Sequence, residues 1–125
     1  MQLDPASEKP IFIQLADEIA DNILKGIYAE DSQIPSTTEV AMALKVNPAT
    51  VNRGVNLLVD QGIVYKKRGL GMFVKPGARK NILARRQQAF FQDYLIHLLK
   101  EATNLGLSSA DVIVMLKQVA GEAAD

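Results

Sequence analysis

The stretch that decides the fold runs from residue 36 to residue 74 and reads STTEVAMALKVNPATVNRGVNLLVDQGIVYKKRGLGMFV. It opens with a capping box, in which the Ser36 hydroxyl accepts from the amide of Glu39 and the Glu39 carboxylate accepts from the amide of Ser36. The apolar residues that follow have helical spacing, which predicts a short helix with a small buried face made by Val40, Ala41 and Leu44.

A second helix is predicted directly after the first. Asn47 is a good N-cap, and Pro48 fits the first helical position because its missing N–H is not needed there. The helix is expected to run to about Gln61, and Gly62 suits the left-handed residue that ends many helices. Its inward face is predicted to consist of Val51, Val55 and Leu58, with Val59 at the edge. The two helices therefore meet across a tight turn.

The end of the stretch changes to the pattern of a β-hairpin. Residues 63–65 and 72–74 are β-branched, aromatic or apolar, and the segment 66–71 between them is basic and contains two glycines. Upstream, Pro10 is expected to open a helix that ends at Gly26, with an apolar face formed by Phe12, Leu15, Ala16, Ile19 and Ile23. Helix, short helix, tight turn, helix and basic hairpin is the order of elements in a winged helix-turn-helix domain.

Charge is strongly segregated along the chain, although the formal net charge is zero. Residues 1–44 hold two basic and eight acidic side chains, residues 45–80 hold eight basic side chains against Asp60 alone, and residues 81–125 hold four and five. The middle segment, with the third helix and the hairpin, is therefore where a polyanion such as double-stranded DNA is expected to bind.

The side chains of this segment suit that partner. Hydroxyl and amide groups bind phosphates or read base edges, and Arg53 is able to contact guanine or clamp a phosphate. Basic side chains at the hairpin tip strengthen binding without specifying sequence, and Gly69 and Gly71 allow positive dihedral angles and a close backbone approach. The predicted DNA-binding residues are Ser36, Thr38, Asn47, Thr50, Asn52, Arg53, Lys66, Lys67, Arg68, Gly69 and Gly71. Asn56 is a further candidate on the third helix.

The C-terminal part is predicted to form two helices. A long helical pattern starts near Arg79 and reaches Ala102, and a second helix begins after the N-cap pattern at Ser108. The long helix carries more apolar surface than one small domain and one short final helix are able to cover. We therefore expect a winged helix-turn-helix domain over residues 1–77 and a helical dimerisation region over residues 78–125. The expected dimerisation residues are Phe90, Phe91, Tyr94, Leu95, Leu98, Leu99, Val112, Ile113 and Leu116.

Several blocks of the sequence resemble the GntR family of bacterial transcription regulators, and particularly its short, YtrA-like subgroup. The blocks lie in order at residues 10–16, 34–41, 46–53 and 61–74. The resemblance implies a homodimeric repressor that binds a palindromic operator. By similarity, Ser36, Asn47, Thr50 and Arg53 correspond to DNA-contacting positions and Gly71 to the wing-tip glycine. The sequence departs from the family pattern at Thr38, where an arginine is usual, and at Leu70, where a small or polar residue is common.

Other classes of function find little support in the composition. The chain has 125 residues and no cysteine, and His97 is its only histidine, so no catalytic constellation, cofactor site or metal site is assembled from it. We expect no enzymatic activity. No leader-like segment or long apolar run is present, so a cytoplasmic protein without membrane association is expected. Two questions stay open at this point: whether the winged helix serves only as a protein-interaction module, and whether an unknown small-molecule effector binds between the helices at the dimer interface.

Overall fold

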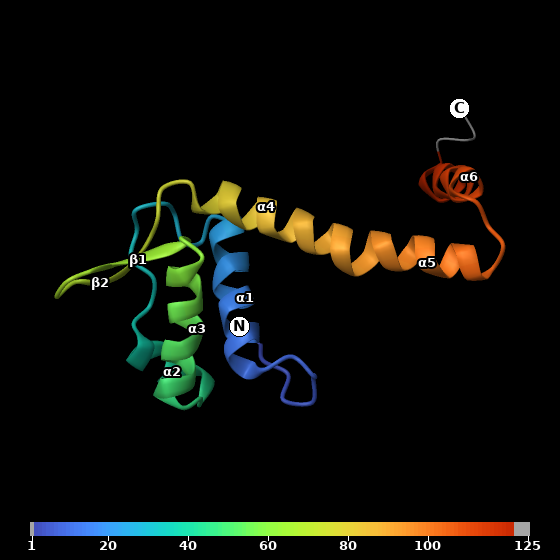
Figure 1. The fold of residues 1–125 in the computed structure, drawn as a ribbon. Coiled ribbons are helices and arrows are strands. Elements are labelled where there is room, and N and C mark those ends of the chain that lie inside the picture. The colour runs from blue at the N-terminus through green and yellow to red at the C-terminus, as the bar shows by residue number, and fades with distance from the viewer. Residues whose placement is uncertain (1, 122–125) are drawn as a thin grey trace. The chain divides into compact units, whose positions relative to one another are not determined.

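The computed structural model describes residues 2–121, which form two compact units that divide between Ala84 and Arg85. The first unit holds α1 (Ile11–Leu24), α2 (Thr37–Leu44), α3 (Pro48–Asp60), β1 (Val64–Lys67) and β2 (Gly71–Val74). Helix α4 (Ala78–Phe90) crosses the division (Figure 1). The second unit continues with a π-helical turn η1 (Phe91–Leu95), α5 (Ile96–Asn104) and α6 (Ser109–Ala120).

The core of the first unit forms where α1 and α3 lie side by side (Figure 1). Leu15, Val51 and Leu58 are fully buried there, as their helical spacing predicted. The sequence pattern did not single out Gly54, which lets the two helices approach closely. A β-carbon at Gly54 would lie 2.7 Å from the carbonyl oxygen of Phe12. Val59 lies outside this core and is 37% exposed.

The helix-turn-helix is built as its local sequence predicts. The capping box of α2 is present, with Ser36 Oγ accepting from Glu39 N at 3.0 Å and Glu39 Oε1 accepting from Ser36 N at 3.2 Å. The turn contains Lys45 in the left-handed conformation, at a φ of 55°. Asn47 then caps α3, because its Oδ1 accepts from Ala49 N at 2.8 Å. These local bonds fix the direction in which α3 leaves the turn.

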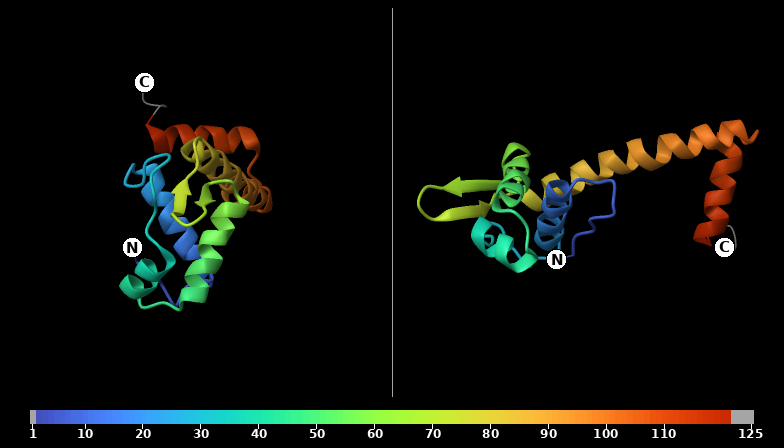
Figure 2. Two further views of the ribbon diagram at one scale, coloured as in Figure 1. Left: turned by 90° about the vertical axis from the view of Figure 1, so that its left-hand side faces the viewer. Right: turned by 90° about the horizontal axis from the view of Figure 1, so that it is seen from below.

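The hairpin of β1 and β2 is antiparallel, with Val64 opposite Val74 and Tyr65 opposite Phe73. Val64 and Val74 are buried and anchor one end of the hairpin to the core, from which its tip extends away from the helices (Figure 2). In the segment before α2, Gln33 forms an isolated antiparallel β-bridge with Phe73 of β2. Ile34 N donates to Met72 O at 2.9 Å, and Val74 N donates to Ser32 O at 2.9 Å.

The start of α4 belongs to the first unit. Ala78 and Ile82 are buried, Asn81 Nδ2 donates to Gln61 O at 2.9 Å, and the Arg79 guanidinium donates to the carbonyl oxygen of Leu24. These contacts fix the N-terminal part of α4 to the C-terminal ends of α1 and α3.

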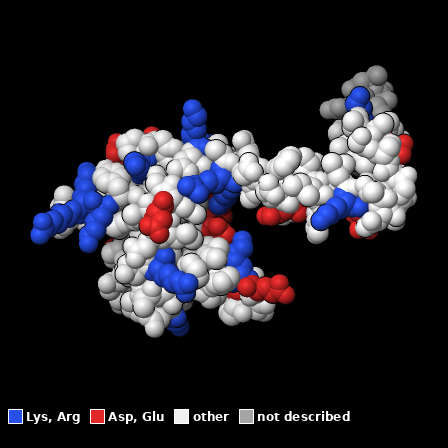
Figure 3. All heavy atoms as spheres, in the orientation of Figure 1, with Lys and Arg blue, Asp and Glu red and all other residues white. Residues whose placement is uncertain are grey.

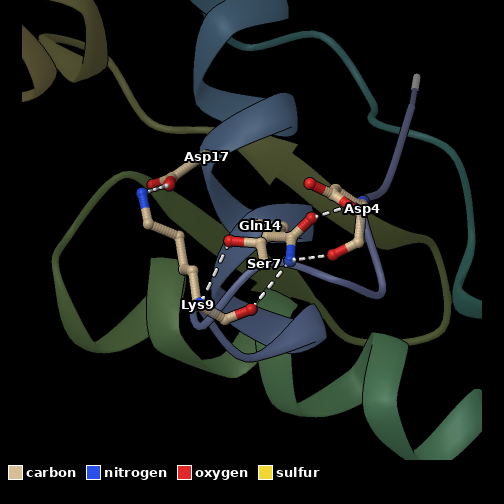
Figure 4. Close-up of polar contacts among 5 residues, drawn as sticks. All are labelled: Asp4, Ser7, Lys9, Gln14 and Asp17. Atoms are coloured by element: carbon tan, nitrogen blue, oxygen red, sulfur yellow. Dashed lines mark hydrogen bonds and ion pairs between the residues drawn. The ribbon is translucent and has the colours of Figure 1, made fainter.

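The N-terminal arm, residues 2–9, folds back onto α1 and is held by Gln14 (Figure 4). Gln14 Oε1 accepts from Asp4 N at 2.7 Å, and Gln14 Nε2 donates to the carbonyl oxygens of Asp4 at 2.9 Å and Lys9 at 2.7 Å. A salt bridge of 2.9 Å joins Lys9 to Asp17, and Leu3 packs against the core. The arm thereby covers the N-terminal end of α1.

The second unit has little core of its own. Ala102 of α5 and Val112 of α6 are its buried apolar residues within the described part of the chain. A second capping box starts α6, with Ser108 Oγ accepting from Asp111 N at 3.1 Å and Asp111 Oδ2 accepting from Ser108 N at 2.9 Å. These bonds lower the pKa of Asp111, the backbone bond most. Across residues 2–121, no helix has both the length and the apolar character that crossing a membrane requires.

Candidate nucleic-acid interface

The outer side of α3 carries polar side chains whose surroundings differ. Asn52, Arg53 and Asn56 are exposed, whereas Thr50 is half-buried and lines a hollow with Leu3 of the N-terminal arm. This polar side lies opposite the buried row of Val51, Gly54, Val55 and Leu58. The helix thus presents amides and one guanidinium to solvent.

Arg53 is not extended freely into solvent. Its guanidinium carbon lies 3.9 Å from the centroid of the Phe12 ring on α1, which is a cation–π contact. The contact keeps the charge at the flank of α3 that faces α1. From this position the guanidinium is suited to contact a phosphate at the edge of a DNA groove, and the stacking on Phe12 fixes the direction in which the guanidinium points.

The N-terminal end of α2 supplies two of the predicted residues. Ser36 uses its hydroxyl oxygen as an acceptor in the helix cap, so its hydroxyl proton is free to donate outward. Thr38 is exposed two residues further on. Because the first amides of a helix favour an anion, this end of α2 is compatible with a phosphate contact.

The hairpin tip is the most basic part of the first unit. Lys66, Lys67 and Arg68 are all exposed, and Lys and Arg side chains gather over this end of the hairpin (Figure 3). Within residues 2–121, none of the three forms an ion pair. Lys67 Nζ lies 4.4 Å from the centroid of the Phe73 ring, which orients this ammonium along the hairpin.

Both tip glycines have the positive dihedral angles that were predicted, with a φ of 77° at Gly69 and 109° at Gly71. Gly71 has an additional role that sequence reasoning missed. Gln33 Nε2 donates to Leu70 O at 2.8 Å and passes so close to Gly71 that a β-carbon there would lie 2.6 Å from this nitrogen. Because Gly71 has no side chain, Gln33 is able to reach Leu70 and to join the hairpin of β1 and β2, the wing, to the segment before α2.

A short helix, a tight turn, a second helix with a polar outer side and a basic hairpin beside it define a winged helix-turn-helix DNA-binding domain. Residues 13–74 match the family described as bacterial regulatory proteins, gntR family. The chain is 27% identical to the HTH-type transcriptional repressor YtrA of Bacillus subtilis (strain 168), over 98% of this chain and 93% of that protein.

Solved structures agree with this match. A chain assigned to the GntR regulators from Bacteroides thetaiotaomicron has a TM-score of 0.78 and 33% identity, over 91% of this chain and 99% of that one. The AraR DNA-binding domain in complex with operator ORX1 has a TM-score of 0.54 and 32% identity, over 59% of this chain and 92% of that one.

The chain belongs to the GntR family and is a sequence-specific DNA-binding regulator of transcription. The resemblance to this family and to its YtrA-like subgroup, predicted from the sequence blocks, is confirmed.

In the tail, a groove of about 790 Å³ lies between α6 and the run of the end of α4, η1 and α5, and five of the nine predicted dimerisation residues line it. Phe90, Tyr94, Leu95, Leu98 and Leu116 line the groove, and His97 lies at it as well. Phe91, Leu99 and Ile113 are exposed outside it, whereas Val112 is already buried within the unit. Among residues 2–121, no three or more His, Asp or Glu side chains are grouped closely enough to hold a metal ion.

Proposed function

We propose that the protein is a homodimeric repressor of transcription that binds a palindromic operator. Each α3 enters the major groove, and each wing contacts the backbone or minor groove. The observation that carries the proposal is that one unit combines an exposed basic hairpin tip, residues 66–68, with a helix α3 whose polar residues Asn52, Arg53 and Asn56 are exposed. The repressor names of relatives such as YtrA support the direction of regulation. The polar and basic side chains of this surface bind DNA, and we assign no catalytic role to any residue.

The tail supports the dimer. Large apolar side chains are exposed at the end of α4 and along η1, α5 and α6, among them Phe90, Tyr94, Leu99, Ile113 and Leu116. Such a surface is unusual for a monomer and suits a second copy, since a twofold interface uses the same patch on both subunits. We assign residues 78–125 to dimerisation and residues 1–77 to DNA binding, in a cytoplasmic protein.

Selection of DNA from a random pool by the purified full-length protein tests the proposal. We expect enrichment of a palindrome with two half-sites and tight binding of that palindrome in the presence of unrelated competitor DNA. Arg53→Ala, checked for unchanged thermal unfolding, is expected to weaken binding to all operator variants alike, as removal of a phosphate-binding group does. Absence of any enriched sequence, with a stable dimer in hand, would favour a protein-interaction module instead.

A small-molecule effector is a separate proposal. The tail groove is the candidate site, because its apolar lining is bordered by Asp93, His97 and Glu101. Thermal-shift screening with and without operator DNA tests whether any compound raises the unfolding temperature and releases the DNA. A screen without such a compound would leave the dimer alone as the occupant of this surface.

A further inference from the structure

The polar residues of α3 are not equally free to read bases. Asn47 uses its carbonyl oxygen to cap the helix, at 2.8 Å from Ala49 N. Arg53 stacks on the ring of Phe12, and Thr50 is half-buried. These residues are therefore placed to position the helix or to meet phosphates, and base reading falls to other side chains.

Asn52 and Asn56 are the remaining amides of the helix. Both are exposed, and neither makes a hydrogen bond to any other residue in the described range 2–121. They lie one turn apart, so both point to the same side of α3. Four residues at a rise of about 1.5 Å each separate them by about 6 Å along the helix axis.

A free asparagine amide is selective for one base. It donates one hydrogen bond and accepts another, which matches the N7 acceptor and the N6 donor of adenine in the major groove. Guanine presents two acceptors there and is matched by arginine instead. The outer side of α3 has no unstacked arginine, because its one guanidinium lies on Phe12.

The neighbours of the two amides fit the same base pair. Ala49, Asn52 and Asn56 line one shallow hollow together with Arg53 and Leu57 of α3 and with Phe12 of α1, on whose ring Arg53 is stacked. A small methyl group such as that of Ala49 suits contact with the methyl group of thymine. Asp60 borders the hollow at the far end, where its carboxylate would be repelled by phosphates and so limits the reading surface.

We propose that Asn52 and Asn56 each read one adenine in the major groove of every half-site. Successive base pairs are about 3.4 Å apart, so a separation of about 6 Å places the two A·T pairs about two steps apart. This inference rests on the DNA-binding function proposed above and adds the sequence class of the half-site, which is A·T-containing at two defined positions.

The test uses the full-length protein and the operator that the random pool yields. Each base pair of one half-site is replaced in turn, and Kd is measured for wild type, Asn52→Ala, Asn56→Ala and the wing control Lys66→Ala. For wild type, replacing either of two A·T pairs about two steps apart should weaken binding by about 5- to 100-fold. Asn52→Ala should remove the dependence on one pair and Asn56→Ala the dependence on the other, while Lys66→Ala weakens binding to all operators alike.

Two further measurements separate base reading from indirect effects. Substitution of 7-deazaadenine, which lacks N7, should weaken wild type at each position and leave the matching alanine variant unaffected. Asn52→Arg should change the preferred base at its position from adenine to guanine. Equal losses on every operator in the asparagine variants, or dependence on G·C pairs alone, would overturn the inference while leaving the DNA-binding function intact. A pool without any enriched sequence would instead overturn the function.

Discussion

Gly71 determines the shape of the wing through both its backbone and its missing side chain. Its φ of 109° is a conformation that other residues rarely adopt, and Gln33 occupies the space beside it. The basic hairpin and the β-turn glycines were predictable from sequence, because they are local features. The contact with Gln33 was not, since it joins residues 38 positions apart and depends on how the first unit folds.

Gly71→Ala is expected to destabilise the first unit by about 1–3 kcal/mol, because it strains the backbone and displaces the Gln33 amide from its hydrogen bond to Leu70 O. Gly69→Ala is the matched control, since Gly69 has a φ of 77° but no atom within 4 Å of the added β-carbon. Thermal unfolding should show a larger loss at Gly71, and the loss caused by Gly71→Ala should be smaller when Gln33→Ala is already present. Equal losses at the two glycines would contradict the role assigned to Gln33.

At the scale of elements, the helix ends follow local chemistry closely. The capping box at Ser36, the N-cap at Asn47 and the helix start at Ser108 lie where the sequence predicted them, and Ser108 forms a second capping box in addition. The π-helical turn of residues 91–95 and the close approach at Gly54 were not predicted. The π-helical turn does not change the spacing of the apolar residues in a way that identifies it. A glycine within a helix only indicates lower helix propensity, and its packing role appears once the position of α1 is known.

The cap of α6 makes a prediction about pH. Hydrogen bonds from Ser108 hold the pKa of Asp111 below the ordinary aspartate value. The carboxylate therefore stabilises α6 fully above the unfolded pKa of about 3.9, and this contribution is lost as the pH falls through the lower folded value. Asp111→Ala should lower the unfolding temperature of the tail at pH 7, and the difference from wild type should shrink towards pH 2.

Ser108→Ala is the control for this series. It removes a hydroxyl that accepts from Asp111 N whatever the pH, so this part of its deficit should persist in acid, whereas the part due to the hydroxyl's interaction with the carboxylate should be lost there. A deficit of Asp111→Ala that is the same at pH 7 and pH 2 would show that the carboxylate charge does not stabilise the cap.

At the scale of the whole molecule, the exposed apolar residues of the tail lead us to expect a dimer, and binding to a two-half-site operator depends on that dimer. Leu99 in α5 is 42% exposed, and Leu99→Glu should shift the protein from dimer to monomer in sedimentation equilibrium, because it places a charge in the proposed interface. Operator binding should weaken with it. Ile27→Glu is the matched control, since Ile27 is 64% exposed in the first unit. A wild type that stays monomeric at micromolar concentration would contradict the dimer.

The most direct test of DNA binding by the winged helix is the salt dependence of binding to the selected operator, compared between wild type and the triple variant Lys66→Ala, Lys67→Ala, Arg68→Ala. If the wing binds phosphates, the slope of log K against log salt should become shallower by about 0.9 for each phosphate that the variant no longer neutralises. A variant that replaces the tail residues Lys100 and Lys117 by alanine should keep the slope of wild type. Identical slopes for wild type and the wing variant would mean that the hairpin does not bind the DNA backbone, and would contradict the role of the wing.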